Sequence, residues 1–192
     1  MKKIGVLALQ GDFEAHQRAF ERAGAAAVQV RTAAELDALD GLAIPGGEST
    51  TMLKLLDSEG MIEPLRRFGA ERPVFGTCAG AILLATRVSN PPQVSLGLMD
   101  IEIERNGYGR QLDSRVVRLS PEEEFLRRAG GGDLEAVFIR APVILETAPG
   151  VRVLARYEGR PVLVEQGRHL VATFHPELTG DARVHALFLE KL

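Results

Sequence analysis

The chain has 192 residues, one cysteine and a formal net charge of −3, and 45% of its residues are hydrophobic. This length fits a single domain over residues 1–192, and one cysteine allows no internal disulfide, which is consistent with a reducing compartment such as the cytoplasm. The acidic balance argues against a nucleic-acid partner, because phosphate binding needs a basic surface. No apolar run approaches the ~20 residues that span a bilayer, which argues against a membrane partner.

The first half of the chain alternates strand and helix patterns. Its strands are short continuous apolar runs, which are typical of a buried parallel sheet. Asp12 and Gly24 are suited to begin and end the first helix. TAAE at 32–35 has a capping-box pattern, and Ser49 and Thr50 can cap a later helix. The expected strands are 3–9, 26–31, 41–45 and 73–77, and the expected helical segments are 12–24, 32–35, 51–60, 61–69 and 79–87.

The second half predicts antiparallel pairing. Residues 100–104 alternate strictly between polar and apolar, and YEGRP at 157–161 joins two strands in a hairpin pattern. RRAGGGDLE at 127–135 is expected to be a surface loop. We therefore expect a three-layer α/β fold, with a mostly parallel sheet flanked by helices and an antiparallel portion in the second half. Further strands are expected at 114–119, 136–141, 151–167 and 169–174, and an amphipathic helix at 180–192.

The only cysteine, Cys78, lies in GTCAGA, between an apolar strand and a helix. Gly-x-Cys-x-Gly in this context is the nucleophile-elbow arrangement with cysteine in place of serine. The glycines at 76 and 80 would remove side chains that collide with neighbouring backbone in so sharp a turn. The helix start favours a thiolate, and the N–H of Ala79 could stabilise an oxyanion. The alternative is a small buried thiol in a tight turn, which these residues alone leave open.

A nucleophilic cysteine needs a base and an orienting group. His175, in ATFHPEL, follows an apolar strand, so it is expected at the same sheet edge as Cys78. Glu177 follows two residues later, and in an extended chain both side chains would project to one side. Of the other histidines, His16 is expected at a surface or interface position on the first helix. The pattern predicts a triad of Cys78, His175 and Glu177.

Several motifs extend this pattern along most of the chain. They are IGVLALQGDFEAH from residue 4, PGGEST from 45, ERNGYGRQLDS from 104, VFIRAP from 137 and FHPELTGD from 174. Together with GTCAGA they resemble the class I, triad-type glutamine amidotransferases, and among these the glutaminase subunits of pyridoxal 5′-phosphate synthases. The resemblance implies a flavodoxin-like fold and hydrolysis of L-glutamine to L-glutamate and ammonia. It also implies a synthase subunit as partner, which receives the ammonia and makes pyridoxal 5′-phosphate, and no cofactor in the glutaminase itself.

The resemblance also implies roles for individual residues. Cys78 matches the nucleophile that forms a glutamyl thioester, His175 the base and later acid, and Glu177 its orienting carboxylate. The glutamine-binding residues it implies are Gly47, Glu48, Ser49, Arg105, Ile139 and Arg140. From elementary chemistry, Arg105 and Arg140 supply cations for the substrate carboxylate, and the N–H of Gly47 could join that of Ala79 as an oxyanion donor. Gln10 and Gly11 end the first strand at the same edge and are expected to face the synthase and the ammonia exit.

Other readings remain open at the level of sequence. One is the glutaminase subunit of another class I amidotransferase, such as imidazole glycerol phosphate synthase, although ERNGYGRQ and FIRAP favour the first assignment. Another is a non-catalytic binding module of the same fold, which the presence of Cys78, His175 and Glu177 argues against. A cysteine peptidase or a DJ-1-like protein also places cysteine at an elbow but lacks FHPE. No Cys-x-x-Cys or His-Glu-x-x-His motif indicates a metal site.

Overall fold

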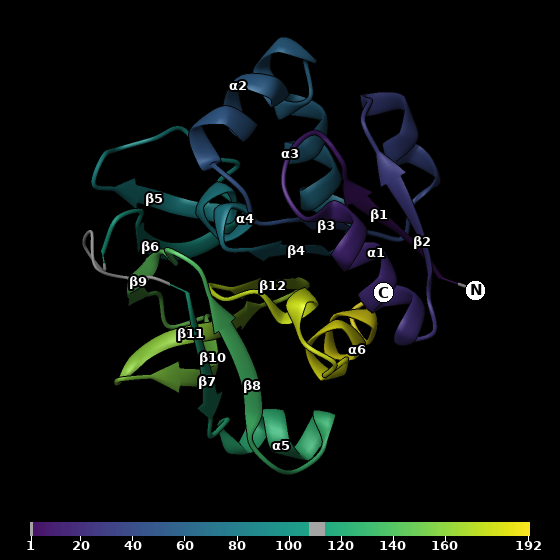
Figure 1. Ribbon diagram of the computed structural model, residues 1–192. Helices are drawn as coiled ribbons and strands as arrows, with labels where there is room; N and C mark the ends of the chain where they lie inside the picture. The colour runs from purple at the N-terminus through teal and green to yellow at the C-terminus, as the bar shows by residue number, and fades with distance from the viewer. Residues whose placement is uncertain (1, 108–113) are drawn as a thin grey trace.

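The computed structural model describes residues 2–107 and 114–192. Within these residues, seven strands form one sheet in the order β10-β11-β12-β4-β3-β1-β2 (Figure 1). The strands from β12 to β2 run parallel to their neighbours, whereas β10, β11 and β12 pair antiparallel. Both the mostly parallel sheet and the antiparallel portion in the second half are thus confirmed. The bounds are β1 Lys3–Leu7, β2 Ala26–Val30, β3 Gly41–Ile44, β4 Val74–Thr77, β10 Arg152–Tyr157, β11 Arg160–Gln166 and β12 His169–Ala172.

Helices cover both faces of this sheet (Figure 1). One core contains Leu56, Phe68 and Leu83 from α2, α3 and α4, and the other contains side chains of α1, α5 and α6, among them Phe20 and Phe188. The expected three layers are therefore present. None of the described helices is long and apolar enough to cross a bilayer. The helices are α1 Phe13–Arg22, α2 Ser49–Ser58, α3 Ile62–Glu71, α4 Ala79–Leu84, α5 Glu123–Ala129 and α6 Arg183–Leu189, with 3₁₀ segments η1 Ala33–Ala38 and η3 Pro176–Leu178.

Two smaller sheets accompany the large one. β5 (Ala85–Ser89), β6 (Met99–Glu104) and β9 (Val143–Thr147) form the first, and β7 (Arg115–Leu119) pairs with β8 (Leu134–Phe138) in the second. The prediction of one helix over 79–87 is wrong, because the chain leaves the helix after Leu84 and pairs in parallel with β6. Thr86 and Val88 are β-branched, which suits the strand. Strand β9 was not among the predicted elements.

The helix ends differ partly from the predicted caps. Gly24 follows α1 with φ +90°, as expected, and Asp12 occupies the N-cap position of α1, although its side chain makes no capping hydrogen bond. The expectation that Ser49 and Thr50 cap α2 is wrong. Glu48 is the N-cap, and its carboxylate accepts hydrogen bonds from the backbone N–H groups of Thr50 and Thr51. The predicted capping box at 32–35 is present but begins a 3₁₀ segment.

The predicted loop at 127–135 is shorter than expected. α5 continues to Ala129 and β8 begins at Leu134. The guanidinium of Arg183 donates hydrogen bonds to backbone carbonyls of the short loop between them, including those of Gly131 and Asp133. The glycine run is therefore tied to the start of α6.

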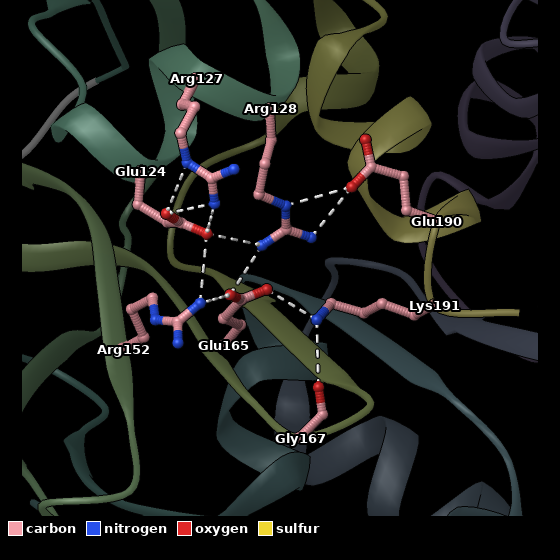
Figure 2. A network of polar contacts seen from close by, with 8 residues as sticks. All are labelled: Glu124, Arg127, Arg128, Arg152, Glu165, Gly167, Glu190 and Lys191. Carbon is pink, nitrogen blue, oxygen red and sulfur yellow. Dashed lines mark hydrogen bonds and ion pairs between the residues drawn. The ribbon is translucent and has the colours of Figure 1, made fainter.

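A network of charged side chains joins α5 and the end of the chain to the antiparallel edge of the sheet (Figure 2). At its centre Glu165 of β11, with 7% of its side chain exposed, accepts hydrogen bonds from Arg128 Nη1 at 2.8 Å and Lys191 Nζ at 2.6 Å. We call this set the Glu165 network. Its members are Glu124, Arg127, Arg128, Arg152, Glu165, Gly167, Glu190 and Lys191.

Candidate active site

Cys78 lies at a sharp turn between β4 and α4. Its backbone has φ 47° and ψ −105°, a left-handed conformation that is strained for any residue with a side chain. The N–H of Cys78 donates to the carbonyl of Ala172 at 3.0 Å, which ties the turn to the end of β12. The side chain is 7% exposed, and Sγ lies 3.9 Å from the carbonyl oxygen of Ile139. The predicted elbow geometry is confirmed.

The flanking glycines are required by the close approach of backbone segments. A Cβ at Gly76 would lie 2.6 Å from the carbonyl oxygen of Gly80, and a Cβ at Gly80 would overlap the carbonyl oxygen of Ile44. Real Cβ atoms do not come so close to backbone oxygen, so any other residue would force β3, β4 and α4 apart. The turn that presents Cys78 therefore depends on both glycines.

His175 reaches the same sheet edge from β12, the parallel neighbour of β4. Its N–H donates to the carbonyl of Val137 at 2.8 Å, and its ring Nδ1 lies 2.7 Å from Glu177 Oε1. The reason for the second contact differs from the one expected. Residues 176–178 form a 3₁₀ turn rather than an extended segment, so Glu177 folds back onto His175 across this turn. Both side chains are almost fully buried.

The surroundings of these groups shift their protonation equilibria. Burial lowers the pKa of His175, but interactions with the side chains of Cys78 and Glu177 outweigh it and raise the pKa to about 10. Burial raises the pKa of Glu177, whereas His16 and the ring of His175 lower it, and the net shift is downward. The geometry thus favours a proton on the imidazole and a charge on the carboxylate beside it. An imidazole held in this way can pass a proton to a group at Cys78.

A cavity of about 580 Å³ opens beside Cys78. The ends of β1, β3 and β4 and the segments after β6, β8 and β12 surround this cavity. Except for Glu177, which lies behind His175, all the predicted site residues line it: Gly47, Glu48, Ser49, Cys78, Ala79, Arg105, Ile139, Arg140 and His175. Gln10 and Gly11 line the same cavity, so their expected place at this sheet edge is confirmed.

The loop after β3 closes one side of the cavity. Gly47 has φ +153°, and a Cβ there would overlap the side-chain oxygen of Gln10. That oxygen accepts a hydrogen bond from the N–H of Glu48 at 3.0 Å. Hydrogen bonds from the hydroxyl and backbone of Thr51 and from Thr50 outweigh the opposing effect of burial and lower the pKa of Glu48 to about 2. A carboxylate that stays charged therefore lies at the rim.

The two predicted arginines enter from other directions. Arg105 Nη2 donates to Thr50 Oγ1 at 2.6 Å and lies 3.6 Å from Glu48 Oε1. Arg140 is exposed and has φ 43°. Residues 108–113, in the middle of the motif ERNGYGRQLDS, lie outside the described residues. The cavity is thus lined by the carboxylates of Glu48 and Asp12 and by two guanidinium groups, a set that suits a small ligand carrying both an acidic and a basic group.

The prediction for His16 is wrong. This residue is fully buried rather than at a surface, with Nε2 2.9 Å from Thr77 Oγ1 and 3.3 Å from Glu177 Oε2. A signal for this was present, because position 16 is three residues after Phe13 and four before Phe20, on the buried face of the helix. Thr77 and Asn106 near the site were also missed, and nothing in their local sequence distinguishes them.

The fold and site define a glutamine amidotransferase. Residues 6–192 match the model of the SNO glutamine amidotransferase family, and the chain belongs to this family. A protein of Solibacter usitatus (strain Ellin6076), named "Pyridoxal 5'-phosphate synthase subunit PdxT", is 62% identical over 192 residues, with all of both chains covered. A protein of the same name from Koribacter versatilis (strain Ellin345) is 56% identical over 188 residues, covering 98% of this chain and 94% of its own.

Solved structures agree with this assignment. A crystal structure described as a glutamine amidotransferase superposes with a TM-score of 0.89 at 46% identity, covering 98% of this chain and 97% of that one. The structure of PurLQS from Thermotoga maritima has a TM-score of 0.76 at 16% identity, with 98% of each chain covered, and shows likeness of fold alone.

Proposed function

We propose that this chain is the glutaminase subunit of a pyridoxal 5′-phosphate synthase. In this proposal it is a single glutaminase domain over residues 1–192 that acts in the cytoplasm, and it hydrolyses L-glutamine to L-glutamate and ammonia. The ammonia goes to a synthase subunit in a hetero-oligomeric complex. The observation that carries the proposal is Cys78 in a left-handed backbone conformation at the edge of a cavity, beside a His175 that is hydrogen-bonded to Glu177. The relatives named as subunits of this synthase support the choice of pathway.

The chemistry proceeds in two halves. The Cys78 sulfur attacks the side-chain amide carbon of glutamine, and the N–H groups of Gly47 and Ala79 are assigned to the oxyanion. His175 gives its proton to the departing nitrogen, which leaves as ammonia, and a glutamyl thioester remains on Cys78. Water then loses a proton to His175 and attacks the thioester carbon, which releases glutamate and its acid proton and restores the Cys78 thiolate beside the protonated His175. Glu177 holds the imidazole throughout.

Glutamine recognition uses the charged rim of the cavity. We assign the substrate carboxylate to Arg105 and Arg140 and its ammonium to Glu48, whose low pKa supports a permanent negative charge. Ser49 and Ile139 complete the pocket. Gln10 and Gly11 are assigned to the side that faces the synthase and the ammonia exit. No part of this chemistry requires a cofactor in the glutaminase chain.

The test is a glutaminase assay with and without the synthase subunit of the same organism. Ammonia release should rise when the synthase is added, and pyridoxal phosphate absorbance should appear when its sugar phosphates are supplied. Cys78→Ala should abolish ammonia release but still bind the synthase. Stimulation by the synthase subunit of the imidazole glycerol phosphate pathway instead would contradict the assignment. If a glutamine-like electrophile leaves Cys78 unmodified even in the complex, the chain is a binding module rather than an enzyme.

A further inference from the structure

A chain of buried polar side chains continues behind Glu177, away from the substrate cavity. His16 Nε2 lies 3.3 Å from Glu177 Oε2, and His16 Nδ1 lies 3.1 Å from His185 Nε2 of α6. Both histidines are 0% exposed. Aromatic rings of Phe20 and Phe75 pack against both. These contacts connect α1 and α6 to the proposed triad through Glu177, although neither histidine lines the cavity.

The second carboxylate oxygen of Glu177 links these two histidines to the proposed triad. Glu177 Oε1 is held by His175, but Oε2 accepts no well-aligned hydrogen bond from the described residues. A buried carboxylate oxygen without a donor is costly. The ring nitrogen of His16, which also lies 2.9 Å from Thr77 Oγ1, is at a distance where its N–H can be shared between the two oxygens.

One arrangement of protons leaves no buried N–H donor of these two rings without an acceptor. If Nε2 of His16 carries the proton, it donates toward Glu177, and Nδ1 accepts from His185 Nε2–H. The nitrogen left without a partner is then His185 Nδ1, a bare acceptor, and that atom has no hydrogen-bond partner among the described residues. In the opposite arrangement a lone pair of His16 would face the carboxylate, and His185 Nδ1–H would be a buried donor without an acceptor. The first arrangement avoids both penalties.

We propose that His16, supported by His185, is a positioning residue that fixes the second oxygen of Glu177 and through it the orientation and Nδ1–H tautomer of His175. The kinetic consequence rests on the proposed glutaminase function, whereas the effect on the protonation of Cys78 does not. His16 acts as a neutral donor, because burial lowers its pKa more than Glu177 and Asp12 raise it, and the charge on His175 lowers it further. His185 is likewise neutral, with burial, His16 and Arg22 all lowering its pKa.

The central experiment compares His16→Phe with His16→Gln in the complex with the synthase. Phenylalanine keeps the ring packing but removes the donor, and kcat for glutamine hydrolysis should fall roughly 10- to 100-fold, as for residues that orient a catalytic group through another. KM should stay near the wild-type value, because His16 does not line the cavity. Glutamine restores a side-chain N–H donor, and kcat should return to within roughly threefold of the wild type.

A second readout does not depend on turnover. The rate of Cys78 alkylation by iodoacetamide, measured against pH, reports formation of the thiolate. A less firmly held Glu177 stabilises the protonated His175 less. The midpoint of the alkylation profile should therefore move up by about one pH unit in His16→Phe. In His16→Gln it should stay near the wild-type midpoint. The matched control is His169→Phe, which removes a buried histidine that accepts from the N–H of Val74 outside the site. It should leave the midpoint unchanged.

The outcomes separate the two proposals. An unchanged alkylation midpoint in a folded His16→Phe protein, or equal losses in the Phe and Gln variants, overturns the role of His16. A shifted midpoint in a protein that never releases ammonia supports that role and counts only against the glutaminase assignment. If the variants do not fold, ¹⁵N NMR of wild-type protein labelled at its four histidines decides the question. Protonation of His16 at Nδ1 instead of Nε2 overturns the proposal.

Discussion

Two buried glutamates organise two different polar networks in this protein. Glu177 and Glu165 are 4% and 5% exposed; Glu165 belongs to β11 of the large sheet, and Glu177 follows β12 of the same sheet. The neighbours of Glu177 are the rings of His175 and His16, at 2.7 and 3.3 Å. Those of Glu165 are permanent cations, from Arg128, Arg152 and Lys191 (Figure 2). A buried glutamate is thus surrounded by histidine rings in one network and by permanent cations in the other.

The difference lies in whether the proton on the partner can move. Imidazole gains and loses a proton near neutral pH, so a carboxylate beside histidines can orient a group that transfers protons. A guanidinium keeps its proton, so a carboxylate surrounded by arginine can only hold structure together. We therefore expect changes at Glu177 to affect turnover and changes at Glu165 to affect stability.

The largest expected effect is that of Glu177→Gln. The amide keeps the shape of the side chain but not its negative charge, so the imidazolium beside Cys78 loses its counter-charge. We expect kcat for glutamine hydrolysis to fall about 10³- to 10⁴-fold, measured as ammonia release in the complex with the synthase. Urea unfolding should show a stability within about 1–2 kcal/mol of the wild type. Turnover close to the wild-type value would mean that Glu177 does not orient His175.

The same substitution at the other glutamate should act the opposite way. Glu165→Gln leaves Lys191, with 8% of its side chain exposed, beside a neutral amide, and the half-buried Arg128 keeps only Glu190 and Glu124 as charged partners. We expect the free energy of unfolding to fall by about 3 kcal/mol, as when one partner of a buried ion pair is removed. The kcat of the folded protein should remain within roughly twofold of the wild type, because no member of the network lines the cavity. A large loss of kcat in a folded Glu165→Gln protein would contradict this separation.

The sequence allowed the Cys78 half of the site to be predicted because its determinants are local. The strand, the glycines and cysteine of the turn and the helix all lie within residues 74–84, and parallel pairing brings the end of β12 to the same edge. The buried position of His16 was not predictable because its partners are distant in the sequence. Glu177 is 161 residues away (177 − 16) and His185 is 169 residues away (185 − 16). A polar residue on a helix is usually exposed, and only tertiary packing reverses this.

The Glu165 network was not predictable for a related reason. Glu165 sits in a strand at a position where the pattern alone would allow a solvent-facing side chain. Its partners Lys191 and Arg128 lie 26 and 37 residues away, in the turn after α6 and in α5. Helix length was likewise misjudged at Leu84, because the strand that follows is stabilised by pairing with β6 rather than by its own composition. Local propensity identifies elements, while long-range pairing decides where they stop.

The pH dependence of stability should come from histidines rather than from the arginine network. Burial, together with the charges of Arg168 and Lys191, lowers the pKa of His169 to about 4. In the unfolded chain this histidine binds a proton near pH 6.5, so between pH 6.5 and 4 the unfolded chain binds more protons than the folded chain. The free energy of unfolding therefore decreases as the pH is lowered through this range. His16 and His185, whose pKa values are also lowered, act in the same direction. Each contributes a slope of at most about 1.4 kcal/mol per pH unit.

His175 gives the opposite sign at alkaline pH. Its pKa of about 10 exceeds the unfolded value, so its stabilisation is fully present below pH 6.5 and is lost as pH rises toward 10. Urea unfolding at pH 5, 7 and 9 should therefore show a maximum near neutrality. His169→Asn should flatten the acid side only, and His175→Asn the alkaline side only. An acid side unchanged by His169→Asn would show that this ring is not kept neutral by the fold.

The smallest expected effect is that of Arg152→Gln, the matched control for Glu165→Gln. Arg152 contacts the same carboxylate oxygen as Arg128, at 3.3 Å, but 60% of its side chain is exposed. Water already screens this charge, and Glu165 keeps Arg128 and Lys191 after the change, so the loss of stability should be about 0–0.5 kcal/mol. Raising the salt concentration should shrink it further, because exposed pairs are screened while the buried ones are not. A loss of stability as large as that of Glu165→Gln would show that the Glu165 network acts as one cooperative unit. The burial of each side chain would then not determine how much it contributes to stability.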